Sequence, residues 1–259
     1  MNYYPLINKQ ECFIKQVDDK SILYVKRLSN KTIALNQTAK YIFDLCDGNN
    51  NIESIIANIL DSFEVDAGEE KVKKDIMGFL KKIDKYGVIA WRKMNNPFIN
   101  KFMCNNMDVI KIGVSSIYRT RLKFTYNIYN VKEDRESYFN KDLYVQGIFN
   151  DFLQCYYVEK DGKPCALVEL QIGDIDRVWE VKKILYNSNF NIKEDFNELL
   201  NKIHDVIIKN VYKNIKLKLG YMLNVTKDFV EIGNLLGFST EAVLNNEVDG
   251  KLYSMWITL

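Results

Sequence analysis

The chain has few of the residues that break, cross-link or chemically activate a fold. Its 259 residues include three prolines, five cysteines and a single histidine. The cysteines are odd in number and at least ten residues apart, which excludes a CxxC zinc knuckle and a disulfide framework. We therefore expect no metal site, buried thiols and a reducing, cytoplasmic compartment.

Long apolar runs and an excess of one charge are also missing. No apolar stretch approaches the ~20 residues that span a bilayer, and the N-terminus lacks the pattern of a signal peptide. The 36 basic and 34 acidic residues give a net charge of only +2, so no excess of positive charge favours binding to nucleic acid or to a membrane surface. The sequence predicts a globular protein that binds neither.

The length suffices for two domains, each with its own core. Pro97 follows the polar stretch Lys93–Asn96 and marks the expected boundary. We predict domains over residues 1–96 and 97–259.

The first half changes from strand-like to helix-like periodicity. Ile22 and Tyr24, then Ile33 and Leu35, alternate with polar residues as in a half-buried strand pair. Apolar stripes then predict three helices, around residues 39–46, 52–63 and 72–83. Strands followed by three short helices indicate a winged-helix-like domain.

This order of elements, with Asn36-Gln37-Thr38-Ala39 opening the first helix, resembles the PqqD family over roughly residues 12–91. The resemblance implies a precursor-peptide recognition element for ribosomally made, modified peptides. In that family a leader peptide adds a strand to the sheet edge beside the last helix. The peptide-binding residues that follow are Thr32, Ile33, Ala34 and Leu35 on the edge, and Lys73, Met77 and Lys81 on the helix.

A winged helix can also bind DNA, and the lysine-rich third helix keeps that rival open. The helix carries acids as well as lysines, Glu69, Glu70, Asp75 and Asp84 among them, and has no Arg, Asn or Gln to read base edges. A solvated surface face is the plain alternative. We expect an acidic, amphipathic peptide as the partner, and no nucleic acid.

The second half predicts a mixed α/β domain. Strands are expected over Val109–Val114 and Arg177–Leu185, and a helix over Ile117–Val131. Asp161-Gly162 between two alternating runs indicates a type I′ hairpin. A long helix from Phe196, a helix ending at Gly237 and two final strands complete the order.

That order, with Leu236-Gly237-Phe238 and the later Asp249–Tyr253, resembles the Gcn5-related N-acetyltransferase (GNAT) fold. The overall fold class is therefore α+β: a winged-helix-like PqqD domain followed by a GNAT-like domain. The resemblance implies acyl transfer from an acyl-coenzyme A.

The residues expected to hold coenzyme A depart from the family pattern. The family binds the pyrophosphate with a glycine-containing loop at a helix start, whereas the corresponding stretch here begins Asn191-Ile192-Lys193-Glu194-Asp195. Acyl-coenzyme A remains the candidate donor, without its usual loop. Glu180, on an alternating strand, is the candidate general base, with an exposed structural carboxylate as the alternative. Tyr253 is the second catalytic candidate, and His204 is expected to be structural.

We predict a protein of modified-peptide biosynthesis, whose first domain binds a leader peptide and whose second acylates the precursor. Other peptide-modifying enzymes are candidate partners. The alternative is a GNAT-like scaffold without activity that chaperones the precursor peptide.

Overall fold

The computed structural model describes the greater part of the chain in twelve segments. These are residues 3–28, 31–63, 68–92, 96–121, 126–127, 141–172, 178–203, 205, 216–219, 233–234, 237–245 and 251–258. The chain divides into two compact units. Unit 1 comprises Met1–Ile99, Ile112–Tyr118 and Lys141–Phe149, and unit 2 comprises the remainder. The predicted division into residues 1–96 and 97–259 stays a prediction.

Two small sheets form the β part of unit 1. Strand β1 (Pro5–Ile7) pairs with β5 (Ile89–Trp91), and β2 (Cys12–Val17), β3 (Lys20–Val25) and β4 (Lys31–Leu35) form an antiparallel sheet in that order. A short 3-10 helix, η1 (Lys26–Leu28), follows β3. The predicted strand pair is confirmed, and Ile33 and Leu35 of β4 are buried as expected. The predicted inward face of the first strand is wrong by one residue, because β3 buries Leu23 and Val25, which lie between and after Ile22 and Tyr24.

Three helices complete the core of unit 1, as the periodicity predicts. They are α1 (Gln37–Leu45), α2 (Ile52–Ser62) and α3 (Glu69–Lys85). The Asn36 side chain accepts a hydrogen bond from the Ala39 N–H at 2.8 Å, and Asn51 accepts one from Ser54 at 2.7 Å. These caps satisfy donors that have no partner inside a helix. Most residues of the expected apolar stripes are buried in all three helices, and Leu60 of α2 is an exception that lies exposed.

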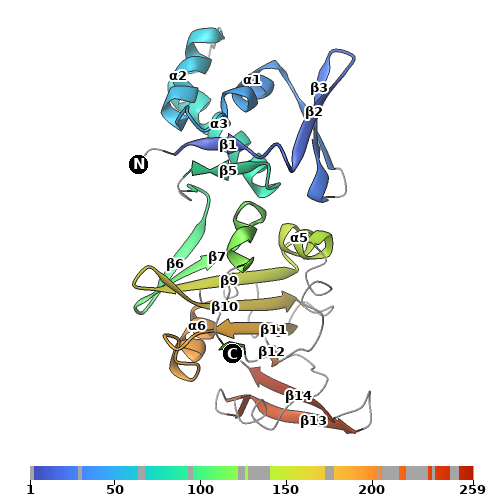
Figure 1. Cartoon of the computed structure of the whole chain (residues 1–259), viewed down its shortest axis with the longest axis vertical. Coiled ribbons are helices and arrows are strands. Elements are labelled where there is room, and N and C mark those ends of the chain that lie inside the picture. The colour runs from blue at the N-terminus through green and yellow to red at the C-terminus, as the bar shows by residue number, and fades with distance from the viewer. Residues whose placement is uncertain are drawn as a thin grey trace. The chain divides into compact units, whose positions relative to one another are not determined.

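Two segments from farther along the chain also belong to unit 1; they are drawn in green and yellow-green in Figure 1. One is the start of the 3-10 helix η3 (Val114–Arg121), and the other is α5 (Lys141–Phe149). Val114 packs against Gly87, whose φ of +71° and lack of a side chain permit the contact. The helix predicted over Ile117–Val131 is wrong in part, because residues 126–127 form strand β8 (Tyr126–Asn127). Pairing with a distant strand overrides local periodicity there.

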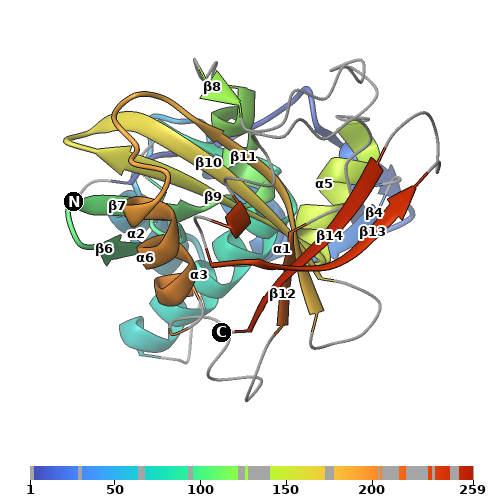
Figure 2. The same ribbon diagram turned by 90° about the horizontal axis from the view of Figure 1, so that it is seen from below.

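Unit 2 is built on one nine-stranded sheet. Its path is β13-β14-β12-β11-β10-β9-β7-β6, and β8 pairs with β11 outside this path. The bounds are β6 Asn100–Cys104, β7 Met107–Lys111, β9 Leu153–Lys160, β10 Lys163–Ile172, β11 Val178–Tyr186, β12 Lys216–Leu219, β13 Ser239–Asn245 and β14 Lys251–Thr258. Among the described strands only β11 and β12 run parallel. Figure 2 shows the red strands β13 and β14 crossing at an angle to the yellow β9 and β10.

The hairpin predicted at Asp161-Gly162 is confirmed. Both residues have positive φ, 51° and 71°, and β9 and β10 pair antiparallel on either side of them. Positive φ at both central positions is the requirement of a type I′ turn. The sequence therefore determines the register at this turn through two residues.

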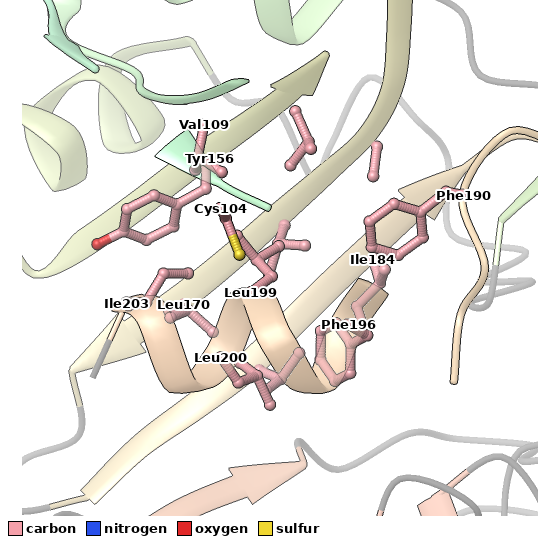
Figure 3. Close-up of a cluster of buried hydrophobic side chains, with 14 of the residues drawn as sticks. Cys104, Val109, Tyr156, Leu170, Ile184, Phe190, Phe196, Leu199, Leu200 and Ile203 are labelled. Atoms are coloured by element: carbon pink, nitrogen blue, oxygen red, sulfur yellow. The ribbon is translucent and has the colours of Figure 1, made fainter. Parts of the chain in front are cut away.

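Helix α6 (Glu194–Ile203) covers one face of the sheet. Its apolar side chains Phe196, Leu199, Leu200 and Ile203 are almost fully buried against Tyr156 and Ile184 of the strands, with Phe190 closing one side (Figure 3). Fully burying side chains of this size contributes roughly 1.5–3 kcal/mol each. This cluster is the core of unit 2. The later part of the predicted long helix, including His204, lies outside the described residues.

All five cysteines are buried, reduced thiols. Burial raises the pKa of Cys46 and of Cys165 to about 12, so both stay protonated and unreactive at neutral pH. The prediction of buried, hydrophobe-like cysteines is confirmed. Within the described ranges no helix has both the length and the apolar content to cross a bilayer.

Candidate functional site

The first candidate site is the edge strand β4. In the described part of the chain, β4 pairs with β3 on one side and with no strand on the other. Thr32 and Ala34 are exposed, whereas Ile33 and Leu35 are buried. Of the four β4 residues among those predicted to bind a peptide, two therefore turn their side chains into the core. These two can contribute only backbone groups to an added strand.

Helix α3 presents the second part of this site. Lys73 and Lys81 are exposed and Met77 is half-buried, outside the core stripe formed by Val72, Ile76, Leu80 and Ile83. No ion pair joins Lys73 or Lys81 to a described carboxylate. Lys73, Met77 and Lys81 therefore form a basic surface on α3 with one apolar residue between the two lysines.

Asp84 differs from the other acids of α3 because it is buried. Its Oδ1 accepts hydrogen bonds from Trp91 Nε1 at 2.7 Å and from Asn96 Nδ2 at 3.0 Å. Burial raises the pKa of its carboxyl group, and these hydrogen bonds oppose the rise. Asp84 thus contributes no surface charge, and the exposed part of α3 is more basic than the sequence alone indicates.

The third candidate site lies on β11 in unit 2. In the described residues its parallel pairing with β12 extends to Val181 opposite Leu219, and β11 continues to Tyr186. Leu170 of β10 lies opposite Val181 and its neighbour Glu169 lies opposite Lys183, so Lys182 is the extra residue of a β-bulge. Bulges re-aim side chains and are frequent beside active sites.

Glu180 stands immediately before this bulge. It lies between Gln171 of β10 and Lys218 of β12 in the register, is half-buried, and forms an ion pair with Lys182. The neighbours Trp179 and Val181 are buried in the α6 core, so Glu180 faces the other side of the sheet. Its role as a base stays a prediction. Tyr253 lies in β14 opposite Val243, and its side chain lies outside the described residues.

A fully buried carboxylate, which sequence reasoning missed, lies on the same face as Glu180. Glu169 of β10 is 0% exposed and lies opposite Cys155 of β9 and Lys183 of β11. Charged groups are almost never buried so completely unless they are paired. The signal in the sequence is one acid inside the apolar run Ala166–Leu170, but only the pairing of strands reveals its surroundings.

The start of α6 is occupied by the chain's own side chains. Asn191 Oδ1 accepts hydrogen bonds from the N–H groups of Lys193 at 3.1 Å and Glu194 at 3.4 Å. Asp195 Oδ2 accepts one from the Asn191 N–H at 2.7 Å and an ion-paired one from Lys160 Nζ at 2.6 Å. Donors that would hold a phosphate are thus engaged, and two carboxylates stand beside them. These residues do not fit a pyrophosphate group.

Comparison with known proteins identifies the first unit. Residues 21–89 match the family model of PqqD, coenzyme PQQ synthesis protein D. The chain therefore contains a PqqD domain, and the predicted α+β fold class with an N-terminal PqqD region is confirmed. The match includes β4 and α3, which carry the predicted peptide-binding residues. No curated protein matches the chain.

Solved acetyltransferase structures are similar to about 60% of the chain. A chimera of spermidine N-acetyltransferase SpeG from Vibrio cholerae and hSSAT has a TM-score of 0.45 and 20% identity, covering 59% of this chain and 95% of its own. Ribosomal-protein-S5-alanine acetyltransferase from Vibrio fischeri has a TM-score of 0.40 and 12% identity, covering 61% of this chain and 96% of its own. An acetyltransferase from Salmonella typhimurium that modifies the N-terminal serine of 50S ribosomal subunit protein L7/L12 has a TM-score of 0.43 and 6% identity, covering 60% of this chain and 96% of its own. At these values no activity follows from the likeness.

Proposed function

We propose that this protein binds a ribosomally made precursor peptide through its PqqD domain and acts in the modification of that peptide. The observation that supports the proposal is the edge of β4, which no described strand pairs with on its outer side, within the segment that matches PqqD. An edge strand offers a row of backbone donors and acceptors to an extended peptide. Side-chain selectivity would come from the residues beside the edge.

The basic surface of α3 supports an acidic leader segment as the ligand. Lys73 and Lys81 are exposed around the half-buried Met77, so the surface combines positive charge with a flexible apolar contact. Opposite charges on two partners increase the association rate and the selectivity. The partner class is therefore an amphipathic peptide with Asp or Glu residues, and no nucleic acid.

For unit 2 the finer proposal is acyl transfer to the bound precursor. Among the described residues, the parallel pairing of β11 with β12 stops at Val181, beside the bulge at Lys182, and β8 pairs with β11 at Leu185 and Tyr186. Glu180 at this place is the candidate base for the acceptor. Because the α6 start does not fit pyrophosphate, a coenzyme A donor would have to be held by other residues.

The second candidate is a scaffold that chaperones the peptide without chemistry. The capped start of α6 favours it, since this feature removes the usual anchor of an acyl donor. Both candidates share the peptide-binding step. Only a change in the mass of the peptide separates them.

The test uses the full chain and a short peptide encoded next to its gene. Calorimetry should show binding of the leader half of that peptide and none of the core half. Incubation with acyl-coenzyme A donors, followed by mass spectrometry, distinguishes the candidates: an added acyl mass supports the transferase, and an unchanged mass supports the scaffold. If neither half binds, the peptide-binding proposal is wrong.

A further inference from the structure

The sheet formed by β2, β3 and β4 buries one of its faces and leaves the other open. Side chains alternate between the two faces of a strand, and the inward set, which includes Leu23 and Ile33, is buried against the helices. Figure 1 shows α1 and α2 on one side of β2 and β3. The other face, here the outward face, carries five apolar side chains that are exposed or half-buried: Phe13, Val17, Ile22, Tyr24 and Ala34.

The outward face is more apolar than the solvated face of an antiparallel sheet usually is. Phe13 and Val17 of β2 are 45% and 40% exposed. The Phe13 ring stacks on the Tyr24 ring of β3, with the ring centres 4.9 Å apart. Exposed apolar side chains that lie side by side in this way indicate an interaction surface.

The outward face continues into any strand that is added to β4. The register places Ile22 of β3 beside Ala34 of β4, and Tyr24 beside Thr32. A peptide strand on the outer edge of β4 alternates in the same way, so every second side chain of the peptide lies on the outward face. A second copy of this chain is a poorer occupant, because two such faces would bring their exposed lysines, Lys15 and Lys20, together.

Ala34 is the smallest side chain on the outward face and lies on the strand next to the added one. A peptide side chain beside Ala34 would be about 10 Å from Ile22, which is twice the spacing of neighbouring strands. The methyl group of Ala34 does not fill this span. A long apolar or aromatic side chain can therefore extend over Ala34 and contact Ile22.

We propose that the docked peptide places a large apolar side chain, and preferably an aromatic one, over Ala34 and against Ile22, here the Ile22 subsite. The peptide would then be held on both faces of its strand, since its alternate side chains point toward the side of the sheet where the helices lie. The inference rests on the proposed peptide-binding function and adds a sequence rule to it. The apolar anchor and a peptide residue that contacts Met77 of α3 must be an odd number of positions apart.

The test starts from a phage-displayed library of random dodecapeptides selected on the full chain. The strongest binder is then synthesised with each position in turn replaced by alanine, and binding is measured by fluorescence anisotropy. We expect one aromatic or large aliphatic position whose replacement weakens binding to the wild type about fivefold to tenfold. The same replacement should weaken binding to Ile22→Thr by about twofold or less.

Val17→Thr is the matched control for Ile22→Thr. Both changes remove apolar surface from the outward face and keep a β-branched side chain, but Val17 lies on β2, two strands away from β4. The effect of the anchor position should therefore be unchanged in Val17→Thr. Circular dichroism checks that each variant is folded. If Ile22→Thr is not folded, Ala34→Gln decides, because its longer polar side chain covers Ile22 and should remove the same effect.

Met77→Ala tests the sequence rule. The peptide position whose alanine replacement loses its effect in Met77→Ala should lie an odd number of residues from the position that depends on Ile22. An even separation overturns the subsite, because both contacts would then come from one face of the peptide strand.

The remaining outcomes separate the subsite from peptide binding itself. A binder whose alanine replacements have equal effects on the wild type and Ile22→Thr overturns the subsite and leaves peptide binding intact. A wild-type dimer that both Ile22→Thr and Val17→Thr dissociate in size-exclusion chromatography would assign the outward face to a second copy and overturn the subsite as well. A selection that enriches no peptide on the wild-type protein overturns peptide binding, and the subsite with it.

Discussion

The indole Nε1 of Trp91 donates a 2.7 Å hydrogen bond to the buried carboxylate of Asp84, and this pair joins the end of α3 to strand β5. Asn96 donates to the same oxygen at 3.0 Å. Burial raises the pKa of Asp84. Because the Asp84 carboxyl group is buried and its hydrogen-bond donors are neutral, the free energy of unfolding should depend on this side chain and on pH.

Replacement of Asp84 should distinguish its hydrogen bonds from its charge. Asp84→Ala leaves the Trp91 and Asn96 donors without their acceptor and should lower the free energy of unfolding by about 2–4 kcal/mol. Asp84→Asn keeps an acceptor oxygen and should cost less than about 1 kcal/mol. Urea unfolding at pH 7 measures both. Equal losses in the two variants would show that the negative charge, and not the acceptor, matters.

The pH dependence follows from the raised pKa of Asp84. The native state binds the proton of this group more tightly than the unfolded state does, so the stabilising contribution of protonated Asp84 is complete below the unfolded pKa. It is lost as pH rises through the folded pKa. The unfolding free energy of Asp84→Asn relative to that of the wild type should therefore increase as pH rises from acid toward neutral. A constant difference from pH 4 to pH 7 would contradict this.

Gly87→Ala tests the packing of the downstream segment on the PqqD domain. A Cβ at Gly87 would lie 2.5 Å from Val114 Cγ1, and the φ of +71° adds strain. We expect a loss of about 2–4 kcal/mol from overpacking and left-handed strain together. Gly162→Ala is the matched control, because it has the same φ but open space around it, and it should cost only about 1–2 kcal/mol.

Addition of Val114→Ala to Gly87→Ala should recover part of the loss, since the added Cβ then has room. Thermal unfolding of the two single variants and the double variant gives this coupling energy. Strict additivity would mean that Val114 does not limit the space at Gly87.

Charge reversal on α3 tests the peptide-binding surface. Lys73→Glu with Lys81→Glu should weaken binding of an acidic leader peptide by more than tenfold, about 1.5 kcal/mol or more. Lys71→Glu with Lys82→Glu changes the net charge equally on another side of the helix and should weaken it much less. Calorimetry at two salt concentrations measures both variants. Equal effects would indicate only a long-range field, and tight binding of duplex DNA at physiological salt would favour the DNA-binding rival.

The capped start of α6 predicts weak binding of acetyl-coenzyme A. Each missing N–H contact to a charged oxygen costs roughly 1.5–3 kcal/mol, so loss of two or three moves a micromolar ligand to the millimolar range. Thermal-shift titration with acetyl- and longer acyl-coenzyme A should give little stabilisation. A clear micromolar effect would restore an ordinary acyl-donor site, and Glu180→Gln would then be the first variant to assay for transfer.

Local signals in the sequence determined much of the fold. The periodicities of α1, α2 and α3 and the Asp161-Gly162 turn depend on residues within one or two turns of each other, so a single stretch of sequence suffices to predict them. The resemblance to PqqD followed from the same elements and agrees with the family match over residues 21–89.

Only the tertiary structure decided which residues of those elements are buried and which distant residues they contact. The sequence does not show that Leu23 and Val25 are the inward residues of β3, that Glu169 is fully buried, or that Lys182 forms a bulge in β11. The contacts of Lys31 and Lys85 with the Phe149 ring join three residues that no local pattern connects. Helices and tight turns are determined by nearby residues, whereas strand partners, burial and charge clusters depend on contacts between distant parts of the chain.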